Sequence, residues 1–425
     1  MGKIETDIVW LRRDLRLVDN VAISNAIKQK STITFLFIFD TNIISELPND
    51  DPRVTFIYDT LLSLNEQLKA HNATLLIRIG KPLDIWKDLT NEFKIQRVYI
   101  NEDYEPYGIE RDRQVQMYFK TNNIKLIQSK DHVVFKPGEI LKKDDTPYTV
   151  YTAYKNKWLT HLKPQRIETI LYNLQGINKS EFKTPTLADL GFKRSSIDVP
   201  KYSFDVINTY NQTRDYPELP TSHIGTFLRF GVVSIREAMQ EALKNDTYLL
   251  ELIWREFFIQ VLYYFPHTVS ECFRSKYNRI KWLNNSVLFE QWCSGNTGYP
   301  LVDAGMRELN ATGFMHNRVR MVCASFMCKH LLIDWRWGEA YFAKKLFDFE
   351  LASNIGNWQW VAGTGCDAAP YFRVFNPDIQ ASKFDINNKY IQKWVPEYGN
   401  STYPQQIVNH KFARERAIKA YKDVL

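Results

Sequence analysis

The chain has 425 residues, which is too many for a single compact core and suits two or three domains. Its 55 Lys and Arg against 48 Asp and Glu give a net charge of +7, and charged (24%) and hydrophobic (44%) residues occur in ordinary globular proportions, which excludes a disordered, collagenous or disulfide-stapled chain. Aromatic residues make up 14% of the chain, which is an unusually large share and bears on the function.

The sequence contains no evident targeting signal. Its start lacks the basic-then-apolar pattern of a signal peptide, and the longest apolar runs, such as Phe35 to Phe39, are far too short to span a bilayer. The five cysteines are odd in number and include no Cys-x-x-Cys pair, which is typical of buried thiols in a reducing compartment. We therefore expect no membrane partner and a location in the cytoplasm, the nucleoid or the nucleus.

Short apolar runs alternate with amphipathic stretches up to about residue 128. The runs are too apolar to have one wet face and are typical of buried parallel strands: residues 7–12, 32–39, 74–80, 97–100 and 124–128. The clearest helical pattern runs from Val54 to Ala70. This alternation predicts a doubly wound α/β domain over residues 1–128. Since no GxGxxG motif or P-loop follows a strand, we expect no nicotinamide-dinucleotide site there.

The pattern changes twice after residue 128. Residues 129–200 are rich in proline and polar residues, which predicts an interdomain connector with one helix near Tyr151 to Leu162. From Phe204 onwards the chain is mostly helical in pattern, and eight of the eleven tryptophans fall between Trp254 and Trp394. Residues 201–425 are therefore predicted to form an all-helical domain with its aromatic residues inside.

The nearly all-apolar helix around Glu251 carries charges that need an explanation. Glu251, Trp254 and Arg255 have i, i+3, i+4 spacing and share one helical face. A carboxylate and a guanidinium in so apolar a helix must be paired or must face a polar cavity. The spacing alone leaves two interpretations open, an internal salt bridge with a packed tryptophan or a ligand pocket.

Two further segments have the chemistry of a phosphate-bearing, planar ligand. Asn317, Arg320 and Met321 fall on one helical face, where an amide and a guanidinium suit amide edges and phosphates, although a solvated basic helix end is the alternative. Thr221 and Ser222 suit a helix start that caps the helix or binds phosphate. His316 is expected to be packed or solvated. No metal-ligand spacing and no nucleophile motif is present, so the reaction type stays open at this point.

Several long segments resemble the DNA photolyase/cryptochrome family, in the family's order and nearly from end to end. They are WLRRDLRLVDN (10–20), TSHIGTFLRFG (221–231), ELIWREFF (251–258), GNTGYPLVDAGMRELNATGFMHNRVRM (295–321), NIGNWQW (354–360), YFRVFNPDIQASKFD (371–385) and HKFARERAIKAYK (410–422). The resemblance is closest to class I cyclobutane pyrimidine dimer photolyases. It implies FAD, held in the helical domain.

The resemblance also implies which residues surround the FAD. For the diphosphate side these are Tyr210, Thr221, Ser222, His223, Ile224, Gly225 and Tyr248. For the flavin and its ribityl chain they are Arg255, Asn317, Arg320, Asp348, Phe349, Glu350 and Asn354. Asn354 matches the position that faces the reactive ring nitrogen, where plant-type cryptochromes carry an aspartate. The neutral amide therefore favours repair.

The substrate side of the resemblance points to the cyclobutane pyrimidine dimer in DNA. The positions that match the dimer pocket or the DNA strand are Arg214, Glu251, Trp254, Asn317, Arg318, Met321, Trp360 and Gln380. The implied activity is that of a carbon–carbon lyase in which photoexcited reduced FAD passes an electron to the dimer, and the electron returns after the ring opens. The lesion must be flipped out of the duplex, for which photolyases are one of the known cases, and tryptophans can stack on it.

Three tryptophans, Trp282, Trp335 and Trp358, match the chain that carries electrons to oxidised flavin. Three rival functions remain: a cryptochrome-type blue-light receptor, a (6-4) photolyase, and a light-independent flavoprotein. A (6-4) photolyase would carry a His-rich motif where HNRVRM stands, and the other two would leave the dimer-pocket match unexplained. We expect a monomer.

The sequence departs from the family pattern at three places. Glu350 replaces a second aspartate near the flavin, and Gly225 with Thr226 replaces a serine-led pair beside the diphosphate. Folate-binding members carry an Asn–Glu pair where Tyr107 and Gly108 stand, so the folate contacts are not matched. The second, antenna chromophore is left open between a deazaflavin, a flavin and none.

Overall fold

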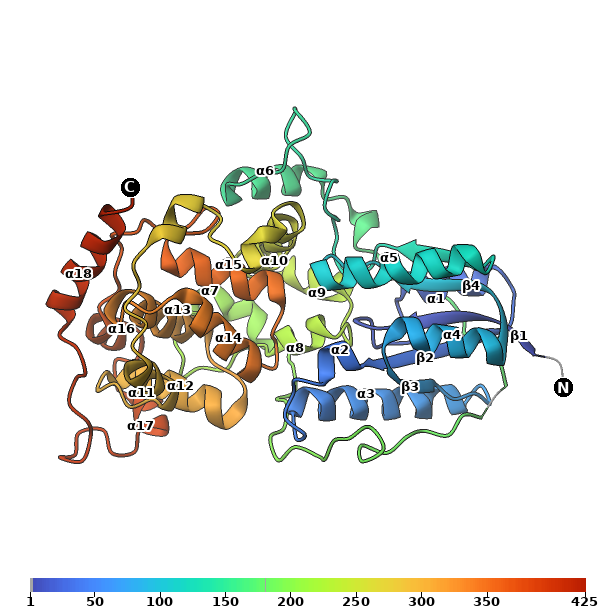
Figure 1. The fold of residues 1–425 in the computed structure, drawn as a ribbon, viewed down its shortest axis with the longest axis horizontal. Helices are drawn as coiled ribbons and strands as arrows, with labels where there is room; N and C mark the ends of the chain where they lie inside the picture. The colour runs from blue at the N-terminus through green and yellow to red at the C-terminus, as the bar shows by residue number, and fades with distance from the viewer. Residues whose placement is uncertain (1–2, 180) are drawn as a thin grey trace. The chain divides into compact units, whose positions relative to one another are not determined.

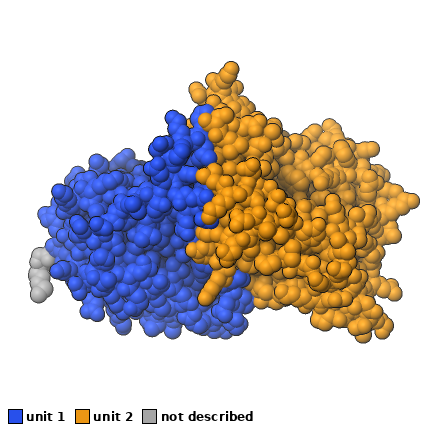
Figure 2. Space-filling model, turned by 180° about the vertical axis from the view of Figure 1, so that it is seen from behind, with its two compact units in different colours: residues 1–136, 161–200, 224–241 blue, residues 137–160, 201–223, 242–425 orange. Residues whose placement is uncertain are grey.

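The computed structural model describes residues 3–179 and 181–425. The chain forms two compact units, each built from separated stretches (Figure 2). Unit 1 comprises residues 1–136, 161–200 and 224–241, and unit 2 comprises residues 137–160, 201–223 and 242–425. Across the described ranges, no helix is both long enough and apolar enough to cross a membrane.

Unit 1 is built on a parallel sheet with the strand order β3-β2-β1-β4-β5. The strands are β1 (Ile4–Leu11), β2 (Ile33–Asp40), β3 (Leu76–Gly80), β4 (Phe93–Asn101) and β5 (Lys125–Ser129). Val9 of β1 lies opposite Phe35 of β2 and Tyr99 of β4, so β1 is the central strand. The five predicted strands and the doubly wound fold are thus confirmed.

Both faces of this sheet are buried under helices, which explains why its strands have no polar face (Figure 1). Val9 and Leu11 of β1 pack in one core with residues of α1 and α3. Ile8 and Trp10, which point the other way, pack in a second core with residues of α4 and α5. The helices of unit 1 are α1 (Val21–Lys28), α2 (Thr41–Ile44), α3 (Pro52–Lys69), α4 (Pro82–Glu92), α5 (Pro106–Thr121), α8 (Ile224–Arg229) and α9 (Ile235–Ala242).

The predicted connector, residues 129–200, is not a separate linker but is divided between the two units. Its helix, α6 (Tyr151–His161), belongs to unit 2, where the indole N–H of Trp158 donates to Glu256 at 2.7 Å. The stretch from 161 to 200 belongs to unit 1, where Tyr172 and Leu187 pack against the first core. Apolar side chains lie between the prolines of this segment and pack against unit 1. The average composition of the segment did not indicate this packing.

Unit 2 is helical around a core rich in tryptophan and tyrosine. Its α-helices are α7 (Tyr210–Thr213), α10 (Asp246–Tyr264), α11 (Ser286–Ser294), α12 (Pro300–Thr312), α13 (Asn317–Ser325), α14 (Trp335–Lys345), α15 (Leu351–Ala362), α16 (Pro377–Phe384), α17 (Lys389–Trp394) and α18 (His410–Lys422), besides α6. A π-helical turn, Phe326–His330, continues α13. Trp292, Trp335 and Trp358 are almost fully buried in this core.

Helix α15 carries several predicted site residues and packs closely against α10 and α14. At Gly356 of α15, an added Cβ would lie 2.2 Å from the ring of Phe258 in α10. At Gly338 of α14, an added Cβ would lie 2.1 Å from the ring of Trp358. Only glycine permits these two approaches, and they fix α15 beside both of its neighbours.

Candidate functional site

Unit 2 has a cavity that opens to solvent, about 540 Å³ including the solvent at its mouth, with walls from α13, α14, α15 and the segment between α14 and α15. The residues expected around the flavin that line it are Asn317, Arg320, Asp348, Phe349, Glu350 and Asn354. Met321, expected on the substrate side, and Trp358, expected in the electron chain, line the same cavity. The predicted face of α13 is therefore a cavity wall and not merely a solvated helix end.

His316 orients this wall. Its Nδ1 accepts a hydrogen bond from the backbone N–H of Arg318 at 3.2 Å, which caps the beginning of α13. The imidazole is buried, and burial together with the nearby Arg320 and Arg318 lowers the pKa of His316 to about 4. His316 is therefore a packed, neutral cap at physiological pH. No group of residues in the described chain has the composition of a metal site.

The two arginines beside the cavity are neutralised by acids. Arg320 contacts both oxygens of Asp348, at 3.1 and 2.9 Å. Arg255 contacts both oxygens of Glu350, at 3.0 and 2.9 Å. Bidentate pairs of this kind hold a guanidinium in one plane. The unusual Glu350 is thus long enough to reach Arg255 and forms an ion pair beside the cavity.

Asn354 is oriented by Glu339, a residue that no sequence motif singled out. The Asn354 Nδ2 donates to Oε1 of Glu339 at 2.8 Å and to its backbone oxygen at 3.2 Å. Since both amide hydrogens point to Glu339, the group that Asn354 presents to the cavity is its carbonyl oxygen, an acceptor. Burial raises the pKa of Glu339, while the Asn354 bond opposes this shift. The two residues are fifteen positions apart, so spacing gave no signal.

The predicted diphosphate residues of unit 2 include a second group of polar side chains. The Tyr248 hydroxyl and the Ser222 hydroxyl are 3.0 Å apart, and the rings of Tyr210 and Tyr248 meet edge-on at 5.0 Å. Thr221 Oγ1 and His223 Nδ1 are buried, and neither has a hydrogen-bond partner among the described residues. Ile224 and Gly225 belong to unit 1, where they open α8.

On α10, Glu251 and Arg255 pair with different segments. Asn245 caps the helix through bonds from the N–H groups of Thr247 and Tyr248. Glu251 pairs with Arg214 at 2.7 Å, whereas Arg255 pairs with Glu350. Burial raises the pKa of Glu251, and Arg214 opposes the shift.

Trp254, on the same face, is stacked by a residue that the sequence did not reveal. The ring of Tyr151 in α6 lies 3.6 Å from the Trp254 ring with an angle of 7° between the planes. The Tyr151 hydroxyl donates to the backbone oxygen of Leu250 at 2.9 Å. Tyr151 therefore fixes the plane of Trp254 from one side. The segment that contributes it was expected to be a connector.

The remaining predicted residues differ in their exposure and in whether they reach the cavity. Trp360 of α15 and Gln380 of α16 are half-buried and outside the lining of the cavity. Of the three tryptophans expected to carry electrons, Trp358 reaches the cavity, Trp335 is fully buried and Trp282 is partly exposed. The ring of Trp358 contacts Phe342 at 4.9 Å, and that of Trp282 contacts Tyr421 at 6.0 Å.

Comparison with known proteins identifies this arrangement. Residues 7–171 match the family model described as DNA photolyase, and residues 248–402 match the FAD binding domain of DNA photolyase. The deoxyribodipyrimidine photo-lyase of a Synechococcus strain is 34% identical over 97% of this chain and 95% of that protein. The chain belongs to the DNA photolyase family.

Solved structures of this family have the same fold as the chain. A bacterial class III photolyase from Agrobacterium tumefaciens superposes with a TM-score of 0.89 at 30% identity, covering 100% of this chain and 98% of that one. A cryptochrome from a Synechocystis strain superposes with a TM-score of 0.85 at 25% identity, covering 99% and 100%. Photolyases and cryptochromes therefore share the fold, and function must be argued from the site.

The cofactor of this photolyase-family chain is FAD, and the residues present fit it. Thr221 and His223 offer buried polar atoms without protein partners, as a site for a polar ligand should. Asn354, the Arg320–Asp348 pair and Glu350 line the cavity, and Glu350 pairs with Arg255 behind it. Each of these features belongs to unit 2.

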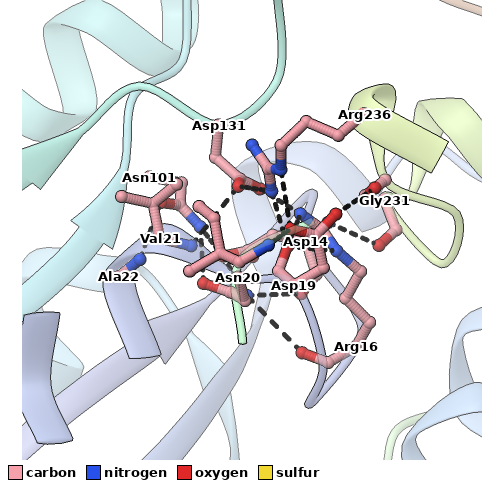
Figure 3. A network of polar contacts seen from close by, with 12 residues as sticks. Asp14, Arg16, Asp19, Asn20, Val21, Ala22, Asn101, Asp131, Gly231 and Arg236 are labelled. Carbon is pink, nitrogen blue, oxygen red and sulfur yellow. Dashed lines mark hydrogen bonds and ion pairs between the residues drawn. The ribbon is translucent and has the colours of Figure 1, made fainter. Parts of the chain in front are cut away.

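Unit 1 satisfies its own polar groups at the point where doubly wound folds commonly bind ligands (Figure 3). The first three N–H groups of α1 donate to side chains of this chain: Val21 to Asp131, Ala22 to Asn101 and Ile23 to Asn20. The beginning of α1 therefore offers no free donor to a phosphate group.

The departure at the folate-matching positions has a structural correlate in unit 1. The Tyr107 hydroxyl donates to Asp40, and an added Cβ at Gly108 would lie 2.5 Å from the Asp103 carboxylate. As α5 is placed here, a glutamate at position 108 would collide with Asp103. The antenna chromophore stays open.

Proposed function

We propose that this chain is a light-dependent lyase that opens cyclobutane pyrimidine dimers in DNA. The observation that carries the proposal is a shared wall. Asn317 and Met321, expected to contact the lesion, line the same cavity as Arg320, Asp348 and Asn354, expected to contact the flavin. Donor and acceptor of an electron can therefore lie side by side without a relay. The curated relatives support this activity, since they are named deoxyribodipyrimidine photo-lyase.

The protein's part in this reaction is binding and orientation. When bound, FAD supplies the light absorption and the electron that opens the cyclobutane ring. Trp254, held by Tyr151, offers a stacking face to a flipped base, a contact worth about 1–3 kcal/mol. Glu251 accepts hydrogen bonds from the pyrimidine edge, and Trp360 packs on the lesion. Arg214, Arg318 and Gln380 contact the DNA strand.

On the FAD side of the cavity, Asn354 and the nearby acidic residues set the polar environment of the flavin. The carbonyl oxygen of Asn354 is an acceptor that adds no charge next to the flavin, and Glu339 keeps it in that orientation. The paired Arg255 and Arg320 bring polarity without a net charge at the cavity. The reaction requires no general acid or nucleophile, which agrees with the absence of a nucleophile motif from the sequence.

Trp282, Trp335 and Trp358 form the electron path to oxidised flavin in this proposal. Trp358→Phe is expected to reduce light-driven reduction of the oxidised flavin at least about tenfold while the pre-reduced enzyme still repairs. Flavin absorbance under illumination, followed with an external reductant present or absent, checks this. Photoreduction at the wild-type rate in the variant would remove Trp358 from the path.

The decisive experiment uses an oligonucleotide that contains one thymine cyclobutane dimer. Purified protein with reduced FAD is illuminated with blue light, beside a dark control and a (6-4) photoproduct substrate. Light-dependent recovery of thymines from the first substrate alone supports the proposal. Repair of the (6-4) lesion would change the substrate, and no repair by a photoreducible holoprotein would favour a cryptochrome-type receptor. We expect a monomer that acts wherever the DNA lies, in the cytoplasm, nucleoid or nucleus.

A further inference from the structure

The two arginines assigned to the DNA strand belong to a cluster with two acids. Asp215 Oδ1 lies 2.5 Å from a terminal nitrogen of Arg318 and 4.0 Å from Nε of Arg214. Arg214 in turn pairs with Glu251 at 2.7 Å. The four side chains are between 18% and 37% exposed, so solvent and ligands reach them. The cluster contains two positive and two negative charges.

The carboxylate of Asp215 occupies the place on Arg318 that a phosphate oxygen would take. Among the described residues, the ion pairs of the Asp215 carboxylate are with these two arginines alone. The Arg318 guanidinium also lies over the ring of Phe384, at 4.4 Å from its centre, which limits its movement. A DNA phosphate must displace or share this carboxylate to gain the full charge of Arg318.

This competition does not affect all DNA equally. Binding to undamaged DNA has no fixed register and depends almost entirely on charge, so an acid beside the arginines weakens it directly. Binding to a lesion adds stacking and hydrogen bonds in the pocket and needs Arg318 in one orientation. In lesion binding, Asp215 holds Arg318 in the required orientation, and this offsets part of the electrostatic attraction to phosphate that its negative charge removes.

We propose that Asp215 is a selectivity residue, whose carboxylate holds Arg318 and weakens binding to undamaged DNA more than binding to lesion-bearing DNA. This inference rests on the proposed function, because it takes Arg214 and Arg318 to contact DNA. It adds to that function a residue in the DNA-binding face that disfavours undamaged DNA.

Asp215→Asn tests the proposal, with Glu218→Gln as the matched control. Glu218 lies three residues further along and pairs with Lys389 at 3.3 Å, so each variant removes one negative charge from the same segment. Dark binding is measured by fluorescence anisotropy with a duplex carrying one thymine dimer and with the same duplex undamaged, over a series of salt concentrations. FAD absorbance and the unfolding temperature report on folding.

The expected result is a loss of selectivity in Asp215→Asn alone. Affinity for undamaged duplex should rise about fivefold at about 0.1 M salt, as for nearly one added phosphate contact, with a steeper salt dependence. Affinity for the lesion duplex should change less than twofold, roughly, so the ratio falls. Asp215→Ser should behave like Asp215→Asn, and Asp215→Glu should restore selectivity.

Several outcomes would overturn the proposal. These are an equal gain for both duplexes, an Asp215→Asn variant that matches Glu218→Gln, and a variant that binds both duplexes more weakly. A wild-type protein that does not prefer the lesion duplex contradicts the proposed function itself, and this is measured before any variant is compared.

Discussion

Two charged networks in this molecule are built from the same residue types but differ in access to solvent. In unit 1, Asp131 pairs with Arg16 at 2.5 Å and with Arg236 at 2.7 Å, and all three side chains are at most 7% exposed (Figure 3). In unit 2, the side chains of Arg214, Glu251, Asp215 and Arg318 are between 18% and 37% exposed. The first network is closed and the second is open.

The difference separates a structural role from a binding role. In the closed network, Asp19 accepts hydrogen bonds from Arg236 through its carboxylate and from Arg16 through its backbone oxygen. Both guanidinium groups are therefore bound from several sides. In the open cluster, Asp215 binds one terminal nitrogen of Arg318, and Nε of Arg318 has no hydrogen-bond partner among the described residues. Arginine–carboxylate pairs alone are therefore not a functional signal. Exposure distinguishes these two networks, whereas the Arg255–Glu350 pair at the flavin cavity is only 11% and 6% exposed.

The largest expected effect comes from breaking the closed network. Asp131→Ala would leave Arg16 and Arg236 buried without their shared partner, and such losses cost about 3–5 kcal/mol of unfolding free energy. Chemical denaturation of the purified protein measures this. The control is Asp59→Ala in the same unit, which removes an exposed pair with Arg194 and should change stability little. Equal costs in both variants would contradict the distinction between closed and open pairs.

A second effect, nearly as large, concerns His316 beside the open cluster. Its pKa in the folded protein is lowered to about 4, whereas the unfolded chain takes up the proton near the ordinary value of about 6.5. Acidification therefore favours the unfolded state, and stability is lost as the pH falls from about 6.5 towards 4, by about 3 kcal/mol in total. His316→Asn keeps a capping side chain without this titration. Unfolding curves of both proteins at pH 7 and near pH 4.5 should converge with acid, and parallel pH dependences would refute the assignment.

Glu251→Ala should affect function more than stability, because its network is open. Loss of a charged hydrogen-bond acceptor for the lesion is expected to lower repair yield about tenfold, equal to about 1.4 kcal/mol. FAD content should stay at the wild-type level, since Glu251 is paired with Arg214 and does not line the flavin cavity. Repair yield per absorbed photon measures the effect, with Glu251→Gln as the variant that keeps the shape. An unchanged yield would end the role assigned to Glu251.

The sequence predicted the local elements well and the long-range partners poorly. Strand runs such as residues 32–39 and the face shared by Asn317, Arg320 and Met321 follow from local periodicity. The helix predicted from 54 to 70 begins slightly earlier, at Pro52, because Asp51 caps it. Pairings that join distant segments have no local period and could not be read in advance. The resemblance to a family provided the list of site residues, but not the contacts that hold them.

The boundary between the units shows the same limit. The proline-rich composition of residues 129–200 suggested a linker, yet Tyr151 from this stretch stacks on Trp254 and Tyr172 packs in unit 1. Which unit an irregular segment joins depends on a few apolar side chains and their distant partners. A composition average over seventy residues removes that information.

The smallest expected effect tests an intermediate case, the half-buried Glu339 whose partner is the neutral amide of Asn354. Burial raises its pKa, so the folded state binds the proton more tightly than the unfolded state, and stability is lost as the pH rises through the folded pKa. Glu339→Gln keeps an acceptor for Asn354 but does not titrate. The variant should therefore become more stable relative to the wild type as the pH rises above the ordinary glutamate pKa of about 4.5. Glu339→Leu, in contrast, frees the amide and should weaken FAD retention on dilution. If Gln and Leu had the same effect on FAD, charge rather than orientation would be what Glu339 contributes.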